Sequence, residues 1–160
     1  TQQDVWSYSF DSQAVTWPIR TSAREGGPRL SPNGRWLAYH SDEGGQLDVY
    51  VAAAASPGER WRVSAQGGIH ARWRADGREL FFLSGSGEVH SVAMDERADR
   101  PLVGRETRLF AAAGLQSQTW WSRYDVTPDG DRFLIAAEVS APAVEGFAMV
   151  LGWGQPGRKE

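Results

Sequence analysis

Short runs of apolar residues, separated by polar turns rich in glycine, recur along the chain. Residues 36–39 (WLAY) and 80–83 (LFFL) are apolar at consecutive positions. Such a run is typical of a strand that is covered on both faces, because neighbouring side chains of a strand point in opposite directions. No stretch shows a sustained helical period. The pattern therefore predicts an all-β fold built from short strands.

A turn motif accompanies these runs and repeats three times. Segments 30–39, 73–82 and 126–135 align without gaps, and their turn glycines lie 43 and 53 residues apart. A period of about 40–50 residues is typical of β-propeller blades, each of which is one four-stranded sheet. We expect positive φ at both residues of each turn, as in a tight hairpin. The structural turn residues are Asn33, Gly34, Asp76, Gly77, Asp129 and Gly130.

A second repeat gives the organisation of the chain. Segments 4–6 (DVW), 48–50 (DVY) and 88–90 (EVH) each open a predicted third strand, and Gly26-Gly27 and Gly67-Gly68 mark predicted crossings between blades. We expect an outer half-blade at about 4–23, complete blades at about 28–65 and 69–110, and an incomplete blade at 122–153 before a polar tail at 154–160. The predicted fold is a β-propeller fragment of about three blade-equivalents, with four-stranded antiparallel blades.

The repeats also resemble a known family. Residues 31–43 (SPNGRWLAYHSDE) resemble the WD40-like (PD40) repeat of the TolB-like propellers. Segments 48–51, 61–64 and 72–82 are closest to the C-terminal propeller of bacterial serine/threonine protein kinases and related regulators, and 124–134 resembles their last blade. Ala75 stands where the repeat usually has proline, and His40 and His90 replace commoner residues. The resemblance implies an interaction or sensor module attached to a larger protein, in an extracytoplasmic, periplasmic location.

Composition and motifs exclude several classes of function. The 160 residues carry 17 Lys+Arg against 20 Asp+Glu, a net charge of -3, which argues against a nucleic-acid partner. No apolar run approaches the ~20 residues of a membrane span, so no membrane insertion is expected. The chain has no cysteine, and its three histidines, at non-equivalent repeat positions, lack metal-binding spacing. Two glycine-containing segments, 129–131 (DGD) and 84–87 (SGSG), are explained as turns. We therefore expect no catalytic residues, no cofactor and no metal.

Two groups of residues are candidates for contact with a partner. Arg29 and Arg72 occupy equivalent places on predicted innermost strands, where they would line the central channel or pair with acids such as Asp48 or Asp125. The second group, Trp120, Trp121 and Arg123, lies in a predicted insertion between blades. It would form a rim contact for a peptide or glycan, or the tryptophans would pack in the core.

These observations favour a non-catalytic module that binds a protein or peptide. The alternative is the propeller of a prolyl-oligopeptidase-type peptidase, which gates substrate access; a glycan binder is a more distant third. Propellers close with about four to eight blades, and closure protects the sheet edges. The chain is therefore expected to be the C-terminal part of a larger propeller, or to form a homodimer of about six blades.

Overall fold

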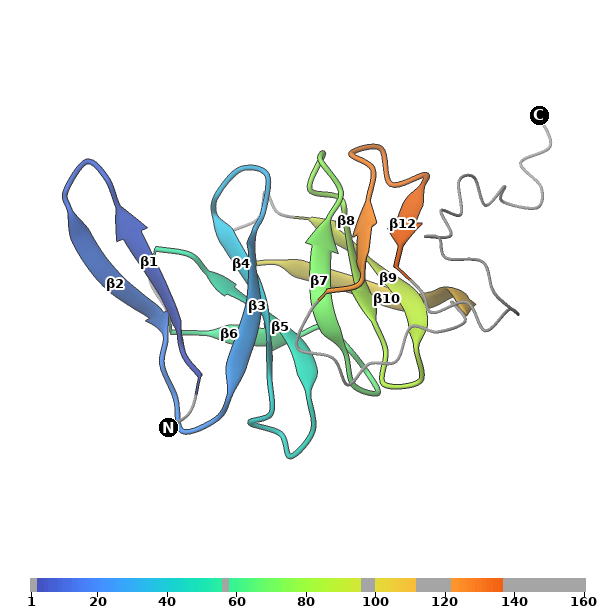
Figure 1. Cartoon of the computed structure of the whole chain (residues 1–160), viewed down its shortest axis with the longest axis horizontal. Helices are drawn as coiled ribbons and strands as arrows, with labels where there is room; N and C mark the ends of the chain where they lie inside the picture. The colour runs from blue at the N-terminus through green and yellow to red at the C-terminus, as the bar shows by residue number, and fades with distance from the viewer. Residues whose placement is uncertain (1–2, 56–57, 96–99, 112–121, 137–160) are drawn as a thin grey trace, which may run out of the picture.

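The strands of the chain stand in a row of separate antiparallel sheets (Figure 1). The computed structural model describes residues 3–55, 58–95, 100–111 and 122–136. In these ranges it contains strands and turns but no helix, so it has no helix able to cross a membrane. The predicted all-β class is confirmed. The strands are β1 (Val5–Ser9), β2 (Ala14–Ile19), β3 (Glu25–Leu30), β4 (Trp36–Ser41), β5 (Asp48–Ala53), β6 (Arg60–Arg62), β7 (Ile69–Trp73), β8 (Glu79–Leu83), β9 (Glu88–Asp95), β10 (Leu102–Ala111), β11 (Tyr124–Val126) and β12 (Phe133–Ile135).

Two of the sheets have four strands, each paired with the next one along the chain. The orders are β3-β4-β5-β6, here called blade 1, and β7-β8-β9-β10, called blade 2. Two-stranded sheets flank them, β1-β2 before blade 1 and β11-β12 after blade 2 (Figure 1). The third strand expected at 147–153 and the polar tail lie outside the described residues.

The apolar runs fill the spaces between neighbouring sheets. β4 is buried along its whole length, as are residues 80–83 of β8. Between blades 1 and 2, Trp36, Val49 and Val51 belong to one cluster with Leu80 and Phe82. Full burial of each such side chain contributes about 1.5–3 kcal/mol. Smaller clusters join β1-β2 to blade 1 and blade 2 to β11-β12, so each sheet is stabilised mainly by its neighbours.

The three repeated turns are equivalent bond by bond. In each, the glycine N–H donates to the carbonyl three residues earlier, at 2.8 Å for Gly34, 2.9 Å for Gly77 and 2.8 Å for Gly130. The side chain before each glycine accepts the backbone N–H two residues further on, at 2.9 Å for Asn33, 3.0 Å for Asp76 and 3.1 Å for Asp129. These local side-chain bonds hold the chain in an Asx turn.

The expectation of positive φ at both turn residues is wrong. The three glycines have φ of 72°, 72° and 82°, but none of the Asn and Asp residues before them has positive φ. The reason is the position of the turn. The glycine N–H bonds to the carbonyl three residues earlier, so the two central residues are the ones before glycine, and only the glycine that follows them adopts the left-handed conformation.

Ala75 also has a structural role in its turn. Its N–H donates to the carbonyl of Pro128 at 3.0 Å, and thereby joins the turn of blade 2 to the turn between β11 and β12. The proline that stands at this position in the other two repeats has no N–H to donate. The departure from the repeat pattern thus provides a bond between neighbouring sheets.

The boundary between β2 and β3 also differs from the prediction. Gly26-Gly27 does not separate two blades but lies inside β3, whose pairing with β4 is irregular between Gly26 and Arg29. Gly27 has φ of 60° at this bulge, and His70 takes the equivalent place in β7 with φ of 57°. Gly67-Gly68, in contrast, does lie between β6 and β7.

Candidate partner-binding surface

The first strands of three successive sheets bring charged residues together at one edge of the molecule. Arg29 of β3, Arg72 of β7 and Asp125 of β11 each lie five residues before the glycine of the repeated turn. They therefore occupy the same position in their sheets. β3 and β7 are in direct contact. In a closed propeller, this edge faces the central channel. We call Arg29, Arg72 and Asp125 the inner row.

Arg72 is held in place by several acceptors. Its Nε lies 3.2 Å from Asp125 Oδ1, and its Nη2 donates to Ser122 Oγ at 2.7 Å. Its Nη1 donates to the Ala71 carbonyl at 2.9 Å, and its Cζ lies 5.6 Å from the centre of the Tyr124 ring. Only 12% of the Arg72 side chain is exposed, against 70% of the Asp125 side chain. Arg72 is thus a fixed positive charge that bridges blade 2 and β11.

Arg29 has a different environment. Its side chain is exposed over much of its surface and partly covered, and its Nη1 donates to the carbonyl of Pro28 at 2.8 Å. Among the described residues, no carboxylate forms an ion pair with it. Partial burial, and next the nearby charge of Arg72, lower the pKa of the Arg29 guanidinium. The inner row therefore contains one satisfied arginine and one with most of its donors facing outward.

Tyr124 is the buried residue that precedes Asp125 of the inner row on β11. It is buried, and its hydroxyl donates to the carbonyl of His70 at 2.7 Å. Burial raises the pKa of Tyr124, so its hydroxyl stays protonated and continues to donate. The Trp73 indole N–H makes a similar link on the other side, to the Arg29 carbonyl at 3.2 Å. These bonds fix the first strands of neighbouring sheets relative to one another.

The structure places only part of the predicted contact residues in this surface. Arg29 and Arg72 lie side by side in the inner row, and of the two acids considered as partners Arg72 pairs with Asp125. Asp48 pairs with Arg62 of its own blade, at 3.0 Å. Arg123 directly precedes β11, and its carbonyl accepts from the N–H of Ala136 at 2.8 Å. Trp120 and Trp121 lie outside the described residues.

Sequence reasoning missed a contact between two histidines. The rings of His40 in blade 1 and His70 in blade 2 meet edge to face, with centroids 5.5 Å apart. Both residues are buried, and burial, with a smaller contribution from His70, lowers the pKa of His40 to about 4. Within the described ranges, no group of three or more His, Asp or Glu residues could hold a metal ion.

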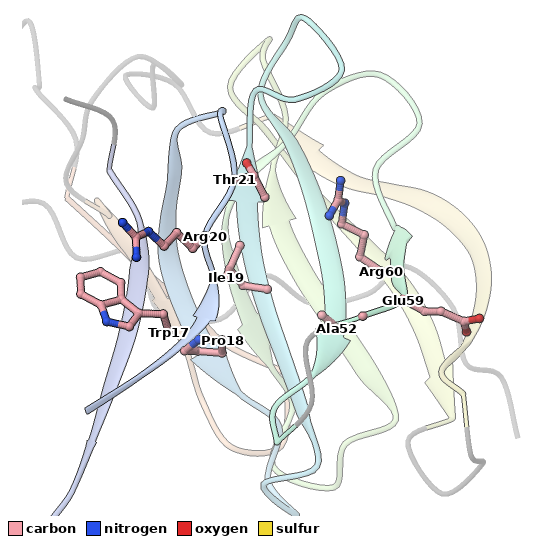
Figure 2. A pocket seen from close by; sticks show the side chains of 9 residues that line it. Trp17, Pro18, Ile19, Arg20, Thr21, Ala52, Glu59 and Arg60 are labelled. Carbon is pink, nitrogen blue, oxygen red and sulfur yellow. The ribbon is translucent and has the colours of Figure 1, made fainter. Parts of the chain in front are cut away.

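A groove lies on a different part of the molecule, between β2 and blade 1. Figure 2 shows Trp17 and Arg20 of the β2 segment on one side and Ala52 and Arg60 of blade 1 on the other. The Arg20 guanidinium lies 5.5 Å from the centre of the Trp17 ring, and Arg60 pairs with Glu43 at 2.7 Å. Both cations of the groove are thus already engaged by neighbours, unlike Arg29.

Comparison with known proteins gives the class of fold. No family model matches the chain. An uncharacterized protein of Agrobacterium fabrum is 30% identical over 138 residues, which cover 81% of this chain and 45% of that protein. The chain thus spans less than half the length of this relative.

Solved structures support the same architecture. TolB from Acinetobacter baumannii has a TM-score of 0.59 at 14% identity and covers 86% of this chain and 32% of its own. An oligogalacturonate lyase in complex with manganese has a TM-score of 0.62 at 14% identity, covering 88% and 39%. The oligogalacturonate lyase of Vibrio parahaemolyticus has a TM-score of 0.57 at 12% identity, covering 84% and 36%. The chain has the fold of a TolB-like β-propeller fragment, as its repeats predict.

Proposed function

We propose that the chain is part of a larger TolB-like propeller that binds a protein or peptide at the inner row without catalysing a reaction. The fold and the partial coverage of longer relatives support the larger propeller. The sequence resemblance supports attachment to a regulatory protein such as a kinase, and an extracytoplasmic location. Self-association of two copies remains a prediction of the sequence.

The observation that carries the proposal is the exposed Arg29 beside the fixed Arg72. Leu30 follows Arg29 on the same strand and is 61% exposed. Because neighbouring side chains of a strand alternate between its faces, Leu30 points to the face opposite Arg29 but lies at the same inner edge of blade 1. Arginine is enriched among the residues that dominate binding at protein interfaces. Because Arg72 is already fixed, a partner that binds here would have to order little more than Arg29.

Two enzymatic alternatives remain. Two structural relatives are oligogalacturonate lyases, one of them with manganese. In the part of the chain that the structure describes, no cluster could hold such an ion, so a metal-dependent reaction would need residues from elsewhere. A propeller that gates a peptidase would also use the channel side, but it requires a hydrolase domain in the same protein.

Site-specific photo-crosslinking in the full-length protein, in its own host, tests the proposal. A photoreactive phenylalanine analogue replaces Leu30 at the inner edge or, as a control, Val15 of β2, which is 50% exposed. We expect a discrete protein or peptide adduct from position 30 and not from position 15. Equal adducts from both positions, or none from position 30, would contradict binding at the inner row.

A further inference from the structure

We propose that Arg29 binds a carboxylate of the partner, and that Arg72 serves as the fixed positive charge behind it. This inference rests on the proposed function and names the chemistry that the inner row recognises. The carboxylate belongs either to an Asp or Glu side chain or to the C-terminus of a peptide.

The equivalence of the three inner-row positions is the first step of the argument. Asp125, the third member, supplies an acid to Arg72 from the next sheet. Arg29 stands in the same relation to Arg72 as Arg72 does to Asp125. Blade 1 thus presents a positive residue that has an arginine, and not an acid, at the equivalent position of the next sheet.

The donors of the two arginines give the second step. A guanidinium has five N–H donors in a planar fork that matches the two oxygens of a carboxylate. Arg72 directs its donors at Asp125, Ser122 and two backbone carbonyls, those of Ala71 and Tyr124. Arg29 donates to the carbonyl of Pro28, within its own strand. Most of its fork is therefore open to a ligand.

Electrostatics gives the third step. Partial burial and the charge of Arg72 disfavour the charged form of Arg29. A carboxylate at Arg29 would reduce the repulsion between the two guanidinium groups and would form charge-assisted hydrogen bonds, which are about twice as strong as neutral ones. Asp125 fills this role only in part: its charge favours the charged form of Arg29, but its Oδ1 accepts from Arg72, and it forms no ion pair with Arg29.

Titration of the full-length ¹⁵N-labelled protein with short peptides tests the proposal. The probes are Ac-Gly-Asp-Glu-Phe with a free C-terminal carboxylate, the same peptide as its C-terminal amide, the neutral Ac-Gly-Asn-Gln-Phe amide, and inorganic phosphate. We expect the Arg29 Nε–H resonance to shift with at least one acidic peptide and not with the neutral amide. Binding of both acidic forms identifies side-chain carboxylates, whereas binding of the free acid alone identifies a C-terminus.

Matched variants assign the effect to Arg29. Loss of a charged hydrogen bond predicts that Arg29→Gln weakens binding of the acidic peptide by about tenfold or more, with Arg29→Lys intermediate. Arg78→Gln, which removes one exposed arginine from the turn of blade 2, should bind like the wild type. Circular dichroism confirms that each variant is folded.

Three results would overturn the inference. They are an unchanged affinity in Arg29→Gln, phosphate binding as tightly as the acidic peptides, and no shift at Arg29 with any acidic peptide at millimolar concentration. An adduct from position 30 together with any of these results would leave the proposed function intact and reject only the carboxylate chemistry.

Discussion

Blades 1 and 2 share their turns and strand order but differ in the burial of the carboxylate at the start of the third strand. Asp48 is 1% exposed, accepts from Ser64 Oγ at 2.8 Å and from the Gly67 N–H at 3.1 Å, and pairs with Arg62. Glu88 holds the equivalent place in blade 2, with a side chain that is 25% exposed and paired with Arg108.

The outer strands explain this difference. β6 has only three residues, and the segment after it continues along β5, with the Val63 N–H bonded to the Val49 carbonyl, so that Ser64 and Gly67 reach Asp48. β10 stays paired with β9 as far as Glu88, which accepts from Ser86 and pairs with Arg108 but stays partly exposed. The repeat thus places the carboxylate, and the segment that follows the outer strand of blade 1 buries Asp48.

Removal of Asp48 should have the largest effect on stability. In Asp48→Ala, the Ser64 hydroxyl and the Gly67 N–H lose their acceptor in a buried place, so we expect a loss of roughly 2–4 kcal/mol in the free energy of unfolding. Urea denaturation measures it. Glu88→Ala is the matched change in blade 2 and should have a clearly smaller effect, because exposed pairs contribute little. Similar losses in both variants would remove the distinction between the blades.

His40 should make blade 1 sensitive to acid. Blade 2 has Leu83 at the equivalent position, and the pKa of His40 is about 4 in the folded chain. The ordinary value of about 6.5 in the unfolded chain means that the unfolded state takes up the proton first as the pH falls. Stability should therefore decrease from about pH 6.5 to about pH 4, by at most about 3 kcal/mol, and this contribution should level off below that range.

His40→Leu introduces the blade 2 residue and checks this slope. Unfolding of wild type and variant is followed at several pH values, so that contributions from other groups, such as Glu25 with its raised pKa, cancel in the difference. We expect the difference between the two proteins to grow in favour of the variant as the pH falls. A difference independent of pH would show that His40 is not held neutral.

Gly68 and Gly85 provide the smallest test. A Cβ at Gly68 would lie 2.7 Å from Phe82 Cδ2 and 3.1 Å from Ser64 Cβ, whereas a Cβ at Gly85 would meet nothing within 4 Å. Gly68→Ala should therefore destabilise the protein by about 1–3 kcal/mol through overpacking between the blades. Gly85→Ala, in the outer turn of blade 2, should change stability by less than about 0.5 kcal/mol. Thermal unfolding compares them, and equal midpoints would contradict the close approach at Gly68.

The sequence predicts those parts of the structure that depend on local chemistry. Asn33-Gly34 and its two counterparts locate the turns because each uses only bonds within a few residues. The placement of Arg29 and Arg72 at one edge follows from the repeat register. The pairing of Arg72 with Asp125 was one of several alternatives, because the repeat register does not show which acid of a neighbouring strand reaches the guanidinium.

Other features could not be predicted because they depend on how sheets stack. His40 and His70 are at different repeat positions, and they meet only because a second strand of one blade faces a first strand of the next. The expected turn conformation is wrong because each turn is centred one residue before the Asn-Gly or Asp-Gly pair, which puts only the glycine at positive φ. The sequence predicts a crossing between blades at Gly26-Gly27, because a bulge inside a strand and a crossing both use glycine.

The bond between Ala75 and Pro128 has a consequence for the order in which the molecule opens. Pro32 cannot donate such a bond across the boundary between blades 1 and 2, whereas Ala75, Tyr124 and Arg72 all bridge blade 2 to the last sheet. The bonds of Ala75, Tyr124 and Arg72 should therefore break together when β11-β12 separates from blade 2. The amide of Ala75 should exchange with solvent only in that event.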